Sequence, residues 1–148
     1  MTHTTWILVA HRAGARLYTQ SGKHQPLHLA ENIPHPEGRL RNRDLDSDAG
    51  GRSFDRFGPQ RHALSPQEAP IDHVADLFAK ELADKLHAGR TNGDCDRIIL
   101  VAGPRLLGKL RLALDPPTAK LVTQGLDKDF GELSDHDLPM VLTDALDL

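Results

Sequence analysis

The residue types best suited to chemistry gather between Gly50 and His62, where glycine, arginine, serine, phenylalanine and histidine follow one another closely. Gly50, Gly51 and Gly58 give the backbone a freedom that indicates a loop with a defined path. A guanidinium group binds phosphate or carboxylate oxygens through paired N–H donors, so arginines in such a loop suit an anionic partner. Residues 39–61 hold half of the chain's arginines, against four aspartates: Arg39, Arg41, Arg43, Arg52, Arg56 and Arg61.

Two interpretations of this arginine run remain open. In the first, the arginines lie along a phosphate backbone while Phe54 or Phe57 stacks on bases. In the second, the arginines pair with four aspartates and tie the loop to its own domain: Asp44, Asp46, Asp48 and Asp55. Composition favours the second interpretation, because mixed charge runs commonly pair internally.

Ser53, Asp55 and His62 could form a nucleophile, an orienting acid and a base on paper. Ser53 lacks the strand-turn-helix context that exposes a nucleophilic serine, and a loop would hold such a triad poorly. The alternative is that Ser53 caps a turn and His62 packs near a helix start. We therefore expect no catalytic residue, and we expect Cys95 to be a small packing residue.

Metal and cofactor motifs are missing from the sequence. A nuclease of the ribonuclease H type needs a carboxylate on its first strand, and neither residues 6–10 nor residues 98–102 contain one. There is no phosphate-binding lysine motif, dinucleotide glycine fingerprint or zinc spacing, and the nine histidines are scattered. We expect no metal and no cofactor.

Bulk properties limit the partners and the compartment. The net charge of −3 and the pI of about 6.3 give no overall basic field. A single cysteine favours a reducing compartment. The apolar run at residues 6–10 is too short for a signal peptide, and no run reaches membrane-spanning length. We expect a cytoplasmic protein with no membrane partner, and the sequence leaves the oligomeric state open.

The hydrophobic pattern predicts the supporting elements. Three strands with short connections, at residues 5–10, 15–20 and 27–33, predict an antiparallel meander. A long functional or mobile loop is expected at about residues 36–65. An apolar stripe at three- and four-residue spacing predicts a long helix that begins near Pro70 and ends at Gly89.

The second half alternates between strands and helices. It predicts a buried strand over residues 96–102, a short helix after Pro104, a turn of helix after Asp115, a weaker strand over 121–126, and a last helix after Ser134. This order predicts an α/β fold of ribonuclease H-like architecture, a single domain over residues 1–148. The first and fourth strands are the most apolar, so we expect them side by side at the sheet centre.

The loop and its setting resemble a known family. A Gly-Gly loop after the third strand, followed by Arg61 and His62 before a long helix, resembles the middle domain of archaeo-eukaryotic class 1 peptide-chain release factors. The whole chain more closely resembles a bacterial offshoot of that superfamily, the host attachment protein family (protein required for attachment to host cells). The matching stretches are residues 6–10, 35–41, 51–55, 61–63, 78–83 and 101–108.

The resemblance implies a fold of the translational-machinery-component type and a link to the ribosome. In release factors the loop carries Gly-Gly-Gln, which places water on the peptidyl-tRNA ester in the peptidyl-transferase centre. Here Arg52 follows Gly51, and its long cationic side chain suits phosphate better than water placement. We also expect neither a codon-reading domain before the chain nor a partner-binding domain after it. The resemblance therefore implies binding to the ribosome, tRNA or rRNA rather than termination.

The candidate binding site follows from these residues. Its members are Arg39, Arg41, Arg43, Gly50, Gly51, Arg52, Ser53, Phe54, Arg56, Arg61 and His62. The principal hypothesis is a non-enzymatic domain that binds RNA or the ribosome through them. One alternative is an adaptor whose loop binds an acidic protein and acts indirectly in host-cell attachment. Another is a hydrolase that uses Ser53 and His62.

Overall fold

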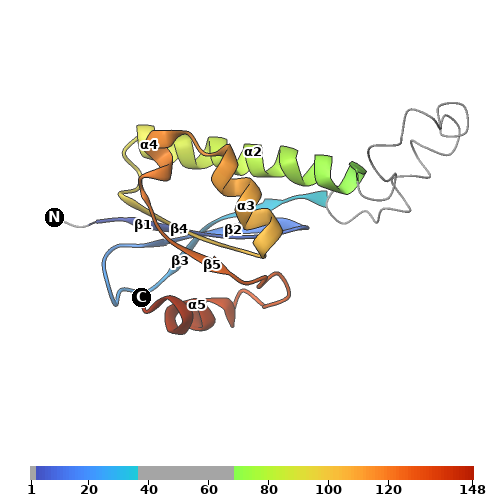
Figure 1. Cartoon of the computed structure of the whole chain (residues 1–148). Coiled ribbons are helices and arrows are strands. Elements are labelled where there is room, and N and C mark those ends of the chain that lie inside the picture. Colours follow the sequence, from blue (N-terminus) through green and yellow to red (C-terminus); the bar gives the residue numbers. More distant parts are fainter. Residues whose placement is uncertain (1–2, 37–68) are drawn as a thin grey trace, which may run out of the picture.

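The structure is a computed structural model that describes residues 3–36 and 69–148, with side chains from residue 72 onward in the second range. Figure 1 shows a twisted sheet between two layers of helices. The elements in chain order are β1 (Thr5–His11), β2 (Gly14–Gln20), β3 (His28–Pro34), α2 (Ala69–Thr91), β4 (Arg97–Ala102), α3 (Pro104–Ala113), α4 (Pro116–Ala119), β5 (Val122–Asp127) and α5 (Leu138–Leu146).

The sheet has the strand order β3-β2-β1-β4-β5. The strand β1 is antiparallel to β2, and β2 is antiparallel to β3, while β4 lies parallel to both β1 and β5. The prediction that the first and fourth strands are central neighbours is confirmed, with Trp6 opposite Ile98 and Val9 opposite Val101. Both strands are buried on both faces, which explains their continuous apolar sequences.

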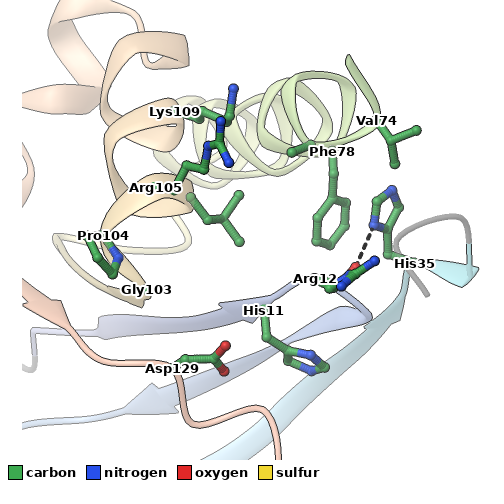
Figure 2. Close-up of a pocket in the computed structure, with 12 residues that line it drawn as sticks. His11, Arg12, His35, Val74, Phe78, Gly103, Pro104, Arg105, Lys109 and Asp129 are labelled. Carbon is green, nitrogen blue, oxygen red and sulfur yellow. Dashed lines mark hydrogen bonds between the residues drawn. The ribbon is translucent and has the colours of Figure 1, made fainter. Parts of the chain in front are cut away.

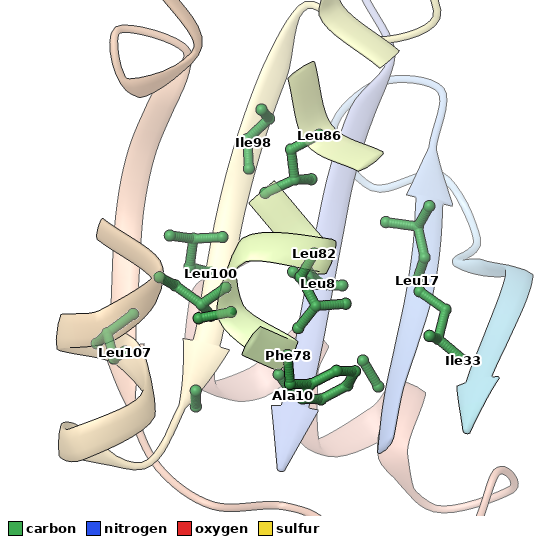
Figure 3. Packing of buried hydrophobic residues seen from close by; sticks show 14 of the residues in the cluster. Leu8, Ala10, Leu17, Ile33, Phe78, Leu82, Leu86, Ile98, Leu100 and Leu107 are labelled. Atoms are coloured by element: carbon green, nitrogen blue, oxygen red, sulfur yellow. The ribbon is translucent and has the colours of Figure 1, made fainter. Parts of the chain in front are cut away.

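Side chains of β1 alternate between two cores. Leu8 and Ala10 face the layer of α2 and α3, whereas Ile7 and Val9 face α5 on the other side of the sheet. The first core, drawn in Figure 3, fills the space between the sheet and the apolar stripe of α2. The second core is closed by the four-residue repeat of α5: Leu138, Leu142 and Leu146.

The predicted end of α2 at Gly89 is wrong, because the helix continues to Thr91. Gly89 lies inside the helix, where the Trp6 ring packs so closely that a Cβ would lie 2.3 Å from it. Gly93 is the residue with the positive φ of +76° at the helix end, and the next amide, that of Asp94, donates to the Gly89 carbonyl at 2.8 Å. The glycine of α2 is thus a packing residue.

Smaller differences occur at two other ends. The third strand includes Pro34, which the prediction left out, because β3 is a sheet edge where a missing N–H is tolerated. Ser134 caps a turn by accepting the Asp137 amide at 3.1 Å, and α5 begins only at Leu138. None of the helices in the described part of the chain contains a hydrophobic stretch of the length needed to span a bilayer.

Candidate functional site

The loop proposed from sequence lies outside the described residues. This applies to all eleven candidate residues, to the expected loop at about 36–65, and to the Ser53 and His62 hypothesis. These expectations stay predictions. The structure does describe the residues next to the loop, which are His35 and Pro36 after β3 and the first turns of α2.

A pocket of about 290 Å³ lies beside these residues. It is at the carboxyl end of the sheet, which we define as the end where β1, β4 and β5 finish at His11, Ala102 and Asp127. Figure 2 shows it between the helices α2 and α3 above and the ends of the strands below. Ligands of open α/β sheets commonly bind at this end, because the strands there give way to loops and helix starts.

The interior of the pocket is apolar. Phe78, Val74 and Ala75 come from successive turns of α2, and Pro104 and Leu106 come from the first turn of α3. The two helices pack against each other over the sheet, so this wall is held by the first core. Such a surface accommodates an apolar or flat aromatic group better than a charged one.

Polar groups surround this interior. They come from the end of β1 and the turn after it, the residue after β3, the helix α3 and the segment after β5: His11, Arg12, His35, Arg105, Lys109 and Asp129. Figure 2 places Asp129 and His11 on the sheet side and Arg105 and Lys109 on the helix side. The rim therefore combines cations, imidazoles and one carboxylate around an apolar interior.

His35 is fixed by three contacts. Its ring stacks on Phe78 with centroids 3.9 Å apart, its amide donates to the Ala13 carbonyl at 2.9 Å, and its Nδ1 lies 3.0 Å from the Arg12 carbonyl. A carbonyl only accepts, so Nδ1 carries a proton. The end of β3, just before His35, lies close to the backbone of Gly14 in β2. A Cβ at Gly14 would lie 2.7 Å from the Ile33 carbonyl oxygen, so this close approach requires glycine. The residue His35 is 8% exposed, and its stacking on Phe78 makes it part of the pocket wall.

His11 has the opposite tautomer. The Ala13 amide donates to its Nδ1 at 3.2 Å, so Nδ1 is unprotonated and Nε2 carries the proton of the neutral ring. The backbone at Gly131 packs against this ring, and a Cβ there would lie 2.6 Å from the His11 Cγ. The Asp129 carboxylate accepts the Gly131 amide at 2.9 Å. These contacts hold the segment after β5 against the end of β1 and form the floor of the pocket.

Arg16 anchors this segment from the α5 side of the sheet. The buried guanidinium donates to the Leu133 carbonyl at 2.8 Å, to the Phe130 carbonyl at 3.1 Å and to Asp135 Oδ1 at 2.9 Å. The planar guanidinium group can donate to all three acceptors at once because its N–H groups point in fixed, diverging directions. Arg16 therefore positions the segment that carries Asp129 and Gly131, although it does not itself line the pocket.

The two cations of α3 that line the pocket, Arg105 and Lys109, pair with acids of α2. Arg105 Nη2 lies 3.0 Å from Asp72 Oδ1, and Lys109 binds Asp76. The Arg105 side chain is 70% exposed, whereas that of Lys109 is 19% exposed. An exposed ion pair contributes roughly 0–1 kcal/mol, so the Arg105 pair can exchange for another anion at little cost.

The described residues that line the pocket offer binding groups and proton carriers but no side-chain hydroxyl or thiol nucleophile. Cys95 is buried elsewhere, just before β4, and burial, followed by the charges of Asp96 and Asp94, raises the pKa of its thiol to about 11. That thiol stays protonated at neutral pH, in line with a packing role. Within the described ranges, no group of three or more potential ligands lies close enough to hold a metal ion.

Sequence reasoning missed this pocket. His11, Gly103 and Asp129 each follow or end a strand that the sequence predicted, and His35 follows the third. The rule that the carboxyl ends of parallel strands meet at one end of a sheet brings the first three together. The glycine- and arginine-rich loop has a stronger local pattern, whereas these strand-end residues are far apart in the sequence.

Comparisons with known proteins add the family. The family described as "Protein required for attachment to host cells" matches residues 6–142. No curated protein matches the chain significantly. The crystal structure of the archaeal translation termination factor aRF1 is similar at 13% identity and a TM-score of 0.43, over 97% of this chain and 39% of that one. A PilM-PilN type IV pilus biogenesis complex is similar at 15% identity and a TM-score of 0.41, over 94% of this chain and 42% of that one.

The two likenesses to solved structures have TM-scores below 0.5, so neither bears on what this chain does. The chain spans about two fifths of the length of each of those chains. The family match is different, because it extends over almost the whole sequence. On that match over residues 6–142, the chain belongs to the family of proteins required for attachment to host cells.

Proposed function

We propose that this protein is a non-enzymatic, cytoplasmic domain that binds RNA or the ribosome through the arginine- and glycine-bearing loop at about residues 36–65. One observation carries the proposal: the described residues on both sides of the loop belong to the wall of the pocket, His35 before it and Val74 and Ala75 after it. In the sequence, the loop's arginines therefore lie between two segments that line the pocket. The pocket rim carries further cations.

The type of partner follows from the chemistry of the loop. Six arginines and neighbouring glycines suit a phosphate backbone, which guanidinium groups and backbone amides bind without reading its sequence. Arg52 occupies the position at which release factors, which the chain resembles, carry the glutamine that places water. The domain, residues 1–148 with this loop, therefore acts by recognition rather than by reaction.

Ribosome sedimentation tests the proposal. The full chain is expected to sediment with ribosomes at low salt and to dissociate as salt rises, because bound phosphates release counterions when arginines replace them. The triple variant Arg52→Ala, Arg56→Ala and Arg61→Ala is expected to weaken this association. It should also reduce the salt dependence. The slope of the logarithm of the binding constant against the logarithm of the salt concentration is expected to fall by about one unit for each phosphate that the variant no longer binds. Absence of association at low salt would contradict the proposal.

A matched triple variant controls for charge. Lys80, Arg97 and Lys120 are exposed cations outside the pocket lining, and their replacement by alanine changes the net charge by the same amount. This control is expected to sediment like the original protein, so equal losses in both triples would show nonspecific attraction. Association that survives nuclease treatment would point instead to an acidic protein partner. Ester hydrolysis that is lost in Ser53→Ala would establish the hydrolase alternative.

A further inference from the structure

The size and interior of the pocket limit what it binds. Its volume of about 290 Å³ is close to the lower end of small-molecule sites, which begin at roughly 300 Å³. The wall formed by Phe78, Val74 and Leu106 suits a flat, weakly polar ring. A single heterocycle fits this description, and an extended peptide or duplex does not.

The first turn of α3 presents backbone amides at the pocket wall. Its N-cap, Gly103, has no capping side chain, and the first helical hydrogen bond is from the Leu107 amide to the Gly103 carbonyl at 2.9 Å. The amides of Arg105 and Leu106 therefore have no acceptor within the helix. Helix starts of this kind bind phosphate. The exposed Arg105 side chain adds a cation whose pairing with Asp72 is readily exchanged.

Asp129 makes a bare anion a poor ligand. Its Cβ lies 3.8 Å from where a Cβ of Gly103 would be, so a carboxylate faces the same end of the pocket as the helix start. A carboxylate repels phosphate but accepts hydrogen bonds from hydroxyl groups, as acids in nucleotide sites do from ribose. The ligand must therefore carry a hydroxyl donor as well as its anionic group.

His35 supplies a second polar group, independent of the helix start. The residue is buried and lines the pocket, and its Nδ1 is used by the Arg12 carbonyl. Its Nε2 has no hydrogen-bond partner among the described residues. In the neutral ring this nitrogen is an acceptor, which suits an N–H donor at the edge of a base.

We propose that the pocket at the carboxyl end of the sheet binds one ribonucleotide, with the base in the apolar interior, the phosphate at the start of α3 and the ribose hydroxyls at Asp129. The inference rests on the proposed function in that an unstacked nucleotide of a bound RNA is the expected source. Single-stranded RNA is commonly recognised through bases that leave their stack and enter pockets of this kind. A free mononucleotide has the same chemistry.

Titration of the full chain with 5′-AMP or 5′-UMP, followed by amide NMR shifts, tests the proposal. Shifts are expected at Arg105, Leu106 and His35. Adenosine and inorganic phosphate, each alone, are expected to bind at least about tenfold more weakly than AMP, because each satisfies only part of the pocket. The 2′-deoxy nucleotide is expected to bind several-fold more weakly. Phosphate that binds as tightly as AMP would overturn the proposal.

Variants locate the binding. Ala75→Leu fills the interior and keeps a strong helix former, so it is expected to weaken AMP binding by tenfold or more. Arg105→Ala is expected to weaken AMP but not adenosine, while Arg97→Ala, at the opposite end of β4, serves as the matched control. Asp129→Asn is expected to reduce the preference for ribose over deoxyribose. AMP binding unchanged in both Ala75→Leu and Arg105→Ala would overturn the assignment.

The two proposals fail separately. The loop triple variant Arg52→Ala, Arg56→Ala and Arg61→Ala is expected to lose ribosome association and to keep AMP binding. If wild-type protein sediments with ribosomes but AMP shifts no pocket amide, the nucleotide pocket is wrong and the proposed function stands. If AMP binds and no ribosome or RNA association exists, the pocket is supported with a free nucleotide as its ligand, and the proposed function is wrong.

Discussion

The two ends of the sheet are formed by the same strands but differ in packing, since the amino end is closely packed and the carboxyl end borders a pocket. At the amino end, where β1 and β4 begin, the Trp6 ring fills all the space above Gly89, and Thr4 and Asp96 exchange backbone and side-chain hydrogen bonds of 2.8 Å. At the carboxyl end, the same strands finish beside a pocket of about 290 Å³. Close packing at one end lets the other remain open at a tolerable cost in stability, which is the arrangement a binding site needs.

The open end is nevertheless organised by buried polar contacts, and breaking them should have the largest effect. Arg16→Met removes the donors to the Phe130 and Leu133 carbonyls and to Asp135. We expect a loss of about 3 kcal/mol in the free energy of unfolding, because desolvated carbonyls would be left without partners. Urea unfolding measures it, and Arg16→Lys, which keeps the charge but not the fork, should recover only part.

The same substitution should also disturb the pocket at a distance. Since Arg16 holds the segment that carries Asp129, the amide shifts of Asp129 and Gly131 are expected to change in Arg16→Lys even though the fold is retained. A loss of less than 0.5 kcal/mol in Arg16→Met, roughly the range of ordinary surface substitutions, would show that the anchoring is unimportant.

The closed end can be tested with a pair of glycines. In Gly89→Ala the new Cβ would meet the Trp6 ring at 2.3 Å, so we expect a destabilisation of about 1–3 kcal/mol from overpacking, despite the better helix propensity. In Gly108→Ala the new Cβ meets no described atom within 4 Å beyond the backbone of its own helix, so helix propensity alone acts and should stabilise α3 by about 0.5–1 kcal/mol. Chemical denaturation compares them, and the same sign in both would refute the close packing of Trp6 on Gly89.

The smallest expected effect concerns Cys95 at the closed end. Burial raises the pKa of its thiol to about 11, from an ordinary value near 9. As the pH rises above 9, the unfolded chain loses this proton while the folded protein keeps it, so stability is full below pH 9 and falls until about pH 11. Part of this decline is expected to disappear in Cys95→Ala, as measured by urea unfolding at pH 8, 9 and 10. Rapid thiol labelling of the folded protein at pH 8 would contradict the burial of this group.

Local sequence was enough for most of the fold. The apolar runs at residues 5–10 and 96–102 predicted the central strands, and the apolar stripe with Pro70 near its start predicted α2. These signals are local, because burial on both faces or on one stripe leaves a direct trace in the order of residues. The end of α2 was missed because Gly89 looks like a helix terminator until Trp6, more than eighty positions away, is placed over it.

Of the two candidate sites, one is recognised from the sequence and the other only from the structure. The arginine- and glycine-rich loop is visible only in the sequence, since its residues lie outside the described structure, and its role stays a prediction. The pocket could not be predicted from any local pattern, because His11, His35 and Asp129 are spread over more than one hundred positions. Sequence by itself determined most of the elements and the family resemblance. Only the tertiary structure decided which side chains meet at the carboxyl end of the sheet, since the stacking of His35 on Phe78 and the anchoring by Arg16 join residues that no local periodicity connects.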